Sequence, residues 1–329
     1  MKKAMILILT LALALLLAGI LPALAATPEN LAYTSEDGLY QYKLRPDGVM
    51  LYGITVTEAD FALPTRIDRK LVTELFYHPQ WQIAVEKVTR VTLPRHVSVI
   101  GDWDIGLNPF CELTDLEEIA VPEQNDVFEV VDGGLYNRET KTLIAYPAAR
   151  QETGFTIQEG TERIAHNALM NCAGLNTIAL PDSLTAFGVC DVETCSNLRR
   201  VEVSDSHPTL KTAGGILFTR DGETLLLYPC GRLNRSYTAP EGTKHIADGA
   251  FCGAASLKTL TLPEGVYSIG AGAFEGCAAL TRINLPASLM EAYFADNLED
   301  CSPDLTFCVS RGTYAEAYCL DNGLKVAYP

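Results

Sequence analysis

The sequence is poor in the residues from which most catalytic and metal sites are built. Its 329 residues include only five histidines and two tryptophans. It contains no C-x-x-C, H-E-x-x-H, G-x-S-x-G or P-loop motif, so nothing indicates a zinc ribbon, a zinc protease, a serine hydrolase or a phosphate-binding loop. We therefore expect a protein that is not an enzyme and that has no metal ion and no cofactor.

Basic residues are also scarce. The chain has 25 lysines and arginines against 41 aspartates and glutamates, which gives a formal net charge of −16. Nucleic-acid binding needs a basic surface, and docking to anionic lipid needs clustered positive charge. This balance argues against both kinds of partner and favours a soluble protein.

Long apolar runs are missing beyond the N-terminus, so we expect no integral membrane segment in the mature protein. The one apolar run covers residues 4–20, follows two lysines and precedes an Ala-Leu-Ala sequence at 23–25. This pattern is typical of a cleaved secretory signal peptide, although an uncleaved membrane anchor is an alternative. Ile20 stands where a lipoprotein would have its lipidated cysteine. We expect a secreted or cell-surface protein.

A repeat dominates the remaining sequence. The segment 257–263 (LKTLTLP) recurs 23 residues later at 280–286 (LTRINLP), and a fixed period of this length is typical of a solenoid, whose coils bury their apolar faces against each other. Phenylalanines 251, 274 and 110 are expected to form a buried stack. Six strands in register are predicted, centred on Val91, Ile119, Ile178, Val201, Leu260 and Ile283.

A second period of 82 residues relates larger units. Residues 128–147 match residues 210–229, and each segment contains a glycine pair and a polar turn between β-rich runs. These segments predict two inserted β-hairpins. The domain boundaries that follow are a signal peptide at 1–25, an N-terminal cap at 26–80, repeats at 81–304, and a C-terminal cap at 305–329 with a short helix between Thr313 and Asn322.

The repeat motif L-x-x-I-x-L-P-x-x-[LV]-x-x-I-G-x-x-A-F-x-x-C-x-x-L is clearest at 257–280. It resembles the bacterial BspA-like, Treponema-type leucine-rich repeats over residues 63–329. The resemblance implies a β-rich solenoid, a right-handed leucine-rich repeat array with a parallel strand ladder. It also implies a role in adhesion, host contact or protein binding, without catalytic residues. Leu169 and Val192 depart from the motif where phenylalanine is expected, and residues 290–293 make the motif of the following coil less clear.

The exposed side chains of stacked strands form a ladder on one surface, which is the usual binding face of such arrays. A merely solvated face is the alternative for each residue. The basic pair Arg199–Arg200 stands out on an acidic chain and would suit a carboxylate or sulfate of a partner. The candidate binding residues are Arg90, Glu117, Glu118, Arg199, Arg200, Glu202, Lys258 and Arg282.

The ten cysteines allow two interpretations. An even number in an exported chain favours disulfides. However, Cys172, Cys195 and Cys277 share one repeat position, which favours small buried apolar residues. If a bridge forms, Cys172–Cys195 is the best candidate, because neighbouring coils would bring these residues together.

Two functions fit these features. The first is a monomeric, exported, non-catalytic module that binds an extracellular protein or glycan. The second is a structural spacer or surface-layer component without a specific ligand.

Overall fold

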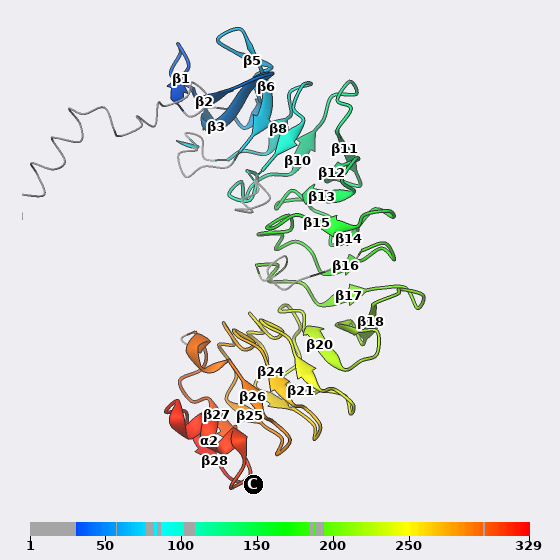
Figure 1. The fold of residues 1–329 in the computed structure, drawn as a ribbon, viewed down its shortest axis with the longest axis vertical. Helices are drawn as coiled ribbons and strands as arrows, with labels where there is room; N and C mark the ends of the chain where they lie inside the picture. Colours follow the sequence, from blue (N-terminus) through cyan, green and yellow to red (C-terminus); the bar gives the residue numbers. More distant parts are fainter. Residues whose placement is uncertain are drawn as a thin grey trace, which may run out of the picture.

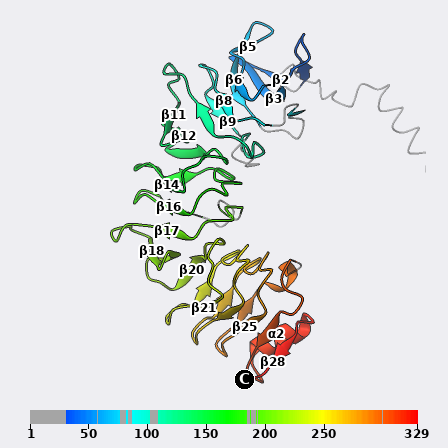
Figure 2. The same cartoon turned by 180° about the vertical axis from the view of Figure 1, so that it is seen from behind.

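The structure is a computed structural model of stacked coils. The coils follow an arc that is open on one side, with a small sheet at one end and a helix at the other (Figure 1), and the reverse view shows the same arc (Figure 2). The predicted signal peptide lies outside the described residues. The structure describes residues 31–56, 58–76, 82–83, 87–101, 109–184, 187, 192, 194–298 and 300–329.

Each regular coil contributes a short strand to a first parallel ladder. The predicted register is confirmed: Val91 pairs with Ile119, Ile178 with Val201, and Leu260 with Ile283. The ladder runs through three sheets, formed by β4 (Asp60–Ala62), β8 (Arg90–Thr92) and β10 (Glu118–Ala120); by β14 (Gly154–Thr156), β16 (Thr177–Ala179) and β17 (Arg200–Glu202); and by β21 (Ser236–Thr238), β23 (Thr259–Thr261), β25 (Arg282–Asn284), β27 (Thr306–Cys308) and β28 (Val326–Ala327).

A second parallel ladder runs beside the first. The sequence pattern does not predict this ladder, because several of its strands are two residues long and show no alternation of apolar and polar residues. Its strands are β6 (Lys70–Leu75) with β9 (Val99–Ile100); β13 (Thr142–Ala145) with β15 (Arg163–Ile164); and β20 (Thr224–Leu227) with β22 (His245–Ile246), β24 (Ser268–Ile269) and β26 (Glu291–Ala292).

The two predicted hairpins are confirmed and are wider than expected. Each is a three-stranded antiparallel meander, made of β11 (Phe128–Val131), β12 (Gly134–Asn137) and β13, or of β18 (Leu210–Ala213), β19 (Ile216–Thr219) and β20. The third strand of each meander enters the second ladder in parallel. The meanders therefore belong to the solenoid wall. We call residues 116–197 the first module and residues 198–279 the second module.

The N-terminal region repeats the meander a third time. Here β1 (Ala32–Thr34), β2 (Tyr40–Arg45) and β3 (Gly48–Val56) are antiparallel, and β3 then pairs in parallel with β6. A register shift occurs in the middle strand of all three meanders, after Gln41, Leu135 or Leu217. Two short strands complete this end, β5 (Arg66–Ile67) and β7 (Gln82–Ile83).

Buried aromatic rings connect the coils of the C-terminal half. Ring centroids lie 5.2 Å apart for Tyr228 and Phe251, 6.0 Å for Phe251 and Phe274, 5.2 Å for Phe274 and Phe294, and 5.3 Å for Phe294 and Phe307. This row confirms the predicted stacking of two of its members. Phe110 instead packs in a separate N-terminal core cluster.

The C-terminal helix α2 (Tyr314–Asp321) closes the array as predicted. Thr313 caps it by accepting the N–H of Glu316 (3.3 Å), and Asn322 is the C-cap. Tyr318 packs on Phe294 with ring centroids 5.0 Å apart, so the helix covers the end of the core. The helix η3 (Ala295–Asn297) lies beside it in contact with the Tyr318 hydroxyl. No helix among the described residues has both the length and the apolar character needed to cross a bilayer.

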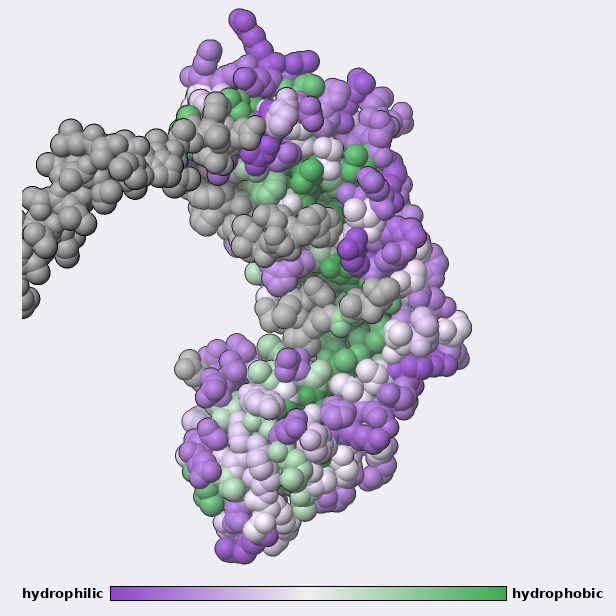
Figure 3. Space-filling model, in the orientation of Figure 1, coloured by the Kyte–Doolittle hydropathy of each residue, from purple (hydrophilic) through white to green (hydrophobic). Residues whose placement is uncertain are grey.

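Hydrophilic side chains cover the outer rim of the arc, and a more hydrophobic band runs along the middle of the face seen in Figure 3. The rim is where coils turn between strands, so polar side chains are expected there.

Candidate functional site

The structure places all eight predicted binding residues on the first ladder. Seven of them are exposed, and Arg90 is partly buried. Some lie within strands, whereas Glu117, Arg199 and Lys258 directly precede β10, β17 and β23. They belong to different coils and fall into regions of opposite charge.

The N-terminal region of this face is acidic and partly neutralised. Arg90 lies 3.4 Å from the Glu118 carboxylate and 3.8 Å from that of Asp60, while Glu117 is exposed beside them. Exposed ion pairs of this kind contribute little to stability, with a median of about 0–1 kcal/mol. These contacts reduce the net charge of the region.

A basic cluster lies further along the same face, around β17. The segment after β20 returns to the ladder here, because Gly231 donates its N–H to Leu198 O (2.8 Å). Arg232 then donates through Nη1 to the carbonyl oxygens of Arg199 (3.0 Å) and Gly214 (2.8 Å). Its guanidinium also lies 5.4 Å from the centre of the Tyr228 ring. Arg232 is therefore fixed beside the predicted pair.

Arg235 extends the cluster to the next coil. Its carbonyl oxygen accepts the N–H groups of Lys258 (2.8 Å) and Thr259 (3.0 Å), so Arg235 and Lys258 are neighbours on adjacent rungs. We define the basic face as Arg199, Arg200, Arg232, Arg235 and Lys258. Arg232 and Arg235 lie outside the strand motif, so the repeat pattern does not identify them, and only Arg232 has a counterpart in the first module. The 82-residue period, which matches Arg232 with Arg150, was the available signal.

Most of the positive charge on the basic face is not neutralised by the protein. Arg200 pairs with Glu202 at 3.1 Å. Arg199, Arg235 and Lys258 are exposed and form no ion pair with any described residue. Grouped like charges create a local positive potential on a chain whose net charge is negative.

Arg282 lies on the next rung beyond Lys258, whose carbonyl oxygen accepts its N–H at 3.1 Å. It is left out of the basic face because other side chains hold its guanidinium. Its Nε donates to Asn284 Oδ1 (2.9 Å) and its Nη2 contacts Cys308 Sγ (2.9 Å), so its guanidinium is bound along the ladder toward the C-terminus.

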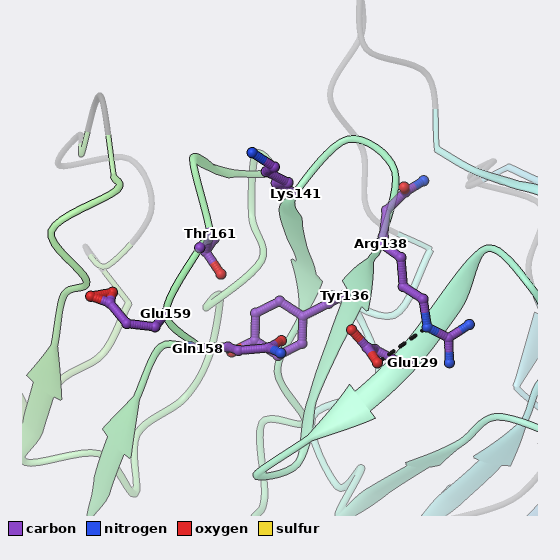
Figure 4. A pocket seen from close by; sticks show the side chains of 9 residues that line it. Glu129, Tyr136, Arg138, Lys141, Gln158, Glu159 and Thr161 are labelled. Atoms are coloured by element: carbon purple, nitrogen blue, oxygen red, sulfur yellow. Dashed lines mark hydrogen bonds and ion pairs between the residues drawn. The ribbon is translucent and has the colours of Figure 1, made fainter.

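A polar pocket of about 190 Å³ lies beside the first meander (Figure 4). The Tyr136 ring points into its centre, and the phenolic oxygen accepts the N–H of Gln158 at 3.1 Å. Burial raises the pKa of Tyr136 to about 12, so this hydroxyl stays protonated. At the rim of the pocket Arg138 forms an ion pair with Glu129 at 3.1 Å, so the charge of this arginine is neutralised.

The predicted cysteine pair is brought together on neighbouring coils. Both residues are buried free thiols in the structure, as the buried-residue interpretation expects, and Cys195 donates to Leu169 O at 3.1 Å. The hydrogen bond with Cys195 and burial hold the pKa of Cys172 well above its usual value. A protonated thiol reacts slowly in disulfide exchange. The Cys172–Cys195 bridge therefore stays a prediction.

Within the described part of the chain, no three His, Cys, Asp or Glu side chains gather in a way that would hold a metal ion. The arrangement that stands out among the described residues is the exposed basic face.

Comparisons with known proteins agree with the repeat pattern. Six copies of the family model described as "BspA type Leucine rich repeat region" match residues 146–219 and 227–303. No curated protein matches the chain.

Several solved structures are similar at low sequence identity. A leucine rich cell surface protein from Faecalibacterium prausnitzii A2-165 is 17% identical, with 91% of this chain and 94% of that chain covered and a TM-score of 0.48. A leucine-rich repeat protein from Eubacterium ventriosum is 21% identical, with 84% and 71% covered and a TM-score of 0.44. The pneumococcal vaccine antigen PcpA is 17% identical, with 92% and 100% covered and a TM-score of 0.41.

Proposed function

The repeat region of this chain belongs to the BspA-type leucine-rich repeat family, and from that premise we propose that the protein is an exported, non-catalytic module that binds an anionic extracellular partner on its basic face. The partner offers carboxylate or sulfate groups, as an acidic protein segment or an acidic glycan does. The N-terminal signal-peptide pattern supports export to the surface or the medium. The module acts as a monomer in this proposal.

One observation supports the site: unpaired basic residues gather on one face of an acidic protein. Arg199, Arg235 and Lys258 lie on adjoining segments and are exposed, so they repel one another, and no described acidic residue pairs with them. An anionic ligand would relieve this repulsion. Guanidinium groups also bind carboxylate and sulfate through paired, charge-assisted hydrogen bonds.

The fold itself does not require these charges. Glu117 and Glu118 occupy the positions of Arg199 and Arg200 in the first module, with the same parallel pairing of the ladder strand. Since both charge signs are compatible with one backbone, the basic pair is better explained by binding than by folding.

The test measures binding of the mature protein to immobilised heparin, a sulfated glycan, and to polyglutamate, an acidic polypeptide, over a range of salt concentrations. We expect binding to at least one probe that weakens as salt screens the charges. Arg199→Ala/Arg200→Ala should reduce the affinity at least about tenfold, because each lost charge-assisted bond contributes about 1.5–3 kcal/mol and tenfold corresponds to about 1.4 kcal/mol.

The matched control is Arg95→Ala/Arg220→Ala, which removes two exposed arginines elsewhere and changes the net charge equally. It should bind as the wild type does. Equal binding by both double variants, or no binding to either probe, would count against the basic face and would favour a structural spacer.

A further inference from the structure

Exposed apolar side chains gather on the second ladder, away from the basic face. Tyr267, Met290 and Tyr293 are 42%, 57% and 62% exposed, respectively. Tyr267 directly precedes β24, and the other two flank β26, which pairs with β24. We call these three residues the aromatic patch.

The repeat does not require apolar residues at these positions. Matching coils carry Ser98, Glu162 or Lys244 where Tyr267 stands. The position of Tyr293 holds glycine or alanine in the coils of β9, β15, β22 and β24, as at Gly270 and Ala247, whereas Phe76 stands there after β6. Large exposed rings at positions that are polar or small in these regular coils depart from the repeat, and such departures are expected at functional sites.

The backbone holds the patch rigidly. The N–H groups of Met290 and Glu291 both donate to Tyr267 O (2.9 and 3.1 Å), and the N–H of Tyr293 donates to Ile269 O (3.0 Å). Core residues alternate with the exposed ones, since Leu289, Ala292 and Phe294 are buried. The rings therefore project from a fixed surface, which lowers the entropy lost on binding.

Polar groups lie between the rings in a fixed arrangement. The Tyr267 hydroxyl donates to Glu291 Oε1 at 2.9 Å, and this bond raises the pKa of Tyr267. The His245 ring meets the edge of the Tyr267 ring at 5.9 Å between centroids, and His245 Nδ1 lies 2.7 Å from Ser268 Oγ. A hydroxyl, a carboxylate and an imidazole thus border the apolar surface.

The charge around the patch does not select an ionic ligand. The nearest lysine, Lys244, is paired with Glu223. Glu291 is already bonded to Tyr267 through one carboxylate oxygen and can accept a hydroxyl donor on the other. These features suit an uncharged ligand that is rich in hydroxyl groups.

The size of the patch argues against a stable protein interface. Such an interface buries about 800 Å² on each partner and involves about 20–30 residues a side, whereas the patch offers three apolar side chains. A sugar ring needs less surface. Its C–H face carries partial positive charge and is attracted to the negative face of an aromatic ring, while its hydroxyls bond to neighbouring polar groups.

We propose that the aromatic patch is a glycan-binding site for an uncharged oligosaccharide, whose sugar rings pack on Tyr267 and Tyr293 and whose hydroxyls bond to Glu291. Met290 lies between them as an apolar contact. This site is independent of the anionic site on the basic face and would bind whether or not that site is real. The two differ in salt dependence, because packing of neutral rings is not screened.

The test is an array of uncharged oligosaccharides of glucose, galactose, mannose and N-acetylhexosamines, followed by titration calorimetry with each positive probe. Wild-type protein should bind at least one of them with affinity that is unchanged between low and high salt. Tyr293→Ala and Tyr267→Ala should each weaken binding at least about tenfold. Tyr293→Phe should retain binding, since it keeps the ring.

Tyr314→Ala is the matched control, because it removes an exposed tyrosine of the C-terminal helix and leaves the patch intact. Arg199→Ala/Arg200→Ala should also leave this binding unchanged. The proposal is overturned if no uncharged oligosaccharide binds or if binding survives both alanine variants.

Discussion

The two modules share the strand pairing of their meanders and carry opposite charges at one exposed rung of the first ladder. Glu117 and Glu118 in the first module stand where Arg199 and Arg200 stand in the second. An ion pair is inverted as well, because Lys141–Glu162 on the second ladder corresponds to Glu223–Lys244. The difference shows that the ladder tolerates either sign at an exposed position, so charge there is free to serve binding.

Buried positions differ between the modules in size and keep their apolar character. Leu169 in the first module corresponds to Phe251 in the second, and both are fully buried. The phenylalanine contacts the rings of Tyr228, Tyr237 and Phe274, whereas the leucine packs in a separate cluster. The core therefore permits changes of volume only when neighbouring coils fill the space.

The largest expected effect is the loss of stability when the buried side chain at this position is truncated in either module. Phe251→Ala should lower the free energy of unfolding by about 3–5 kcal/mol, because it removes a ring that stacks between coils. Leu169→Ala should cost about 2–5 kcal/mol, and less than the Phe251 change. Urea unfolding followed by circular dichroism compares them. A smaller loss for Phe251→Ala than for Leu169→Ala would show that the aromatic row is not what stabilises the second module.

The next effect concerns Asn125 and His207, which lie three residues before the first strand of their meanders. Asn125 Oδ1 accepts the N–H groups two and three residues ahead (3.0 and 2.8 Å), and His207 Nδ1 accepts the matching pair (3.3 and 3.1 Å). Only Asn125 also donates, to Val97 O at 2.9 Å. Among the described residues, His207 Nε2 has no partner.

Substitutions of Asn125 should lower the free energy of unfolding in steps, according to how many of its hydrogen bonds are lost. Asn125→His keeps the two accepted bonds and loses the donated one, at about 0.5–1.5 kcal/mol. Asn125→Ala also leaves buried N–H groups unpaired, which costs about 1–3 kcal/mol more. Midpoints of urea unfolding give the order. If Asn125→His is as unstable as Asn125→Ala, histidine cannot replace asparagine at this position of the first module.

A third experiment transfers the charge of the second module to the first. Glu117→Arg/Glu118→Arg should raise affinity for the anionic probe that the wild type binds by about tenfold, roughly 1.4 kcal/mol, and steepen its salt dependence. The control Glu36→Arg/Asp47→Arg changes net charge equally at exposed N-terminal positions. A similar gain in the control would mean that net charge, and not position on the ladder, governs binding.

Features of the core that recur in every coil could be predicted from the sequence. The positions of exposed site residues, which do not recur, could not. The register of Val91 with Ile119 and the cap at Thr313 follow from apolar spacing and capping residues, which folding constrains directly. Arg235 and Tyr293 were not identified as site residues, because exposed side chains carry no periodic signal. Their grouping depends on which segments the coils bring together, which only the three-dimensional structure shows.

The smallest expected effect tests the inverted ion pair. The hydrogen bond from Lys141 holds the pKa of Glu162 below its usual range, so this pair stabilises the fold above the unfolded pKa of about 4.3 and loses that contribution as pH falls through the lower folded pKa. Lys141→Ala should flatten this acid dependence, seen by comparing urea midpoints at neutral and acidic pH.

Lys141→Glu should destabilise the protein at neutral pH by placing two carboxylates together, and Lys141→Glu/Glu162→Lys should restore its stability, because the second module already uses that arrangement. Failure of the double exchange to rescue would show that the modules differ in more than the sign of their charges.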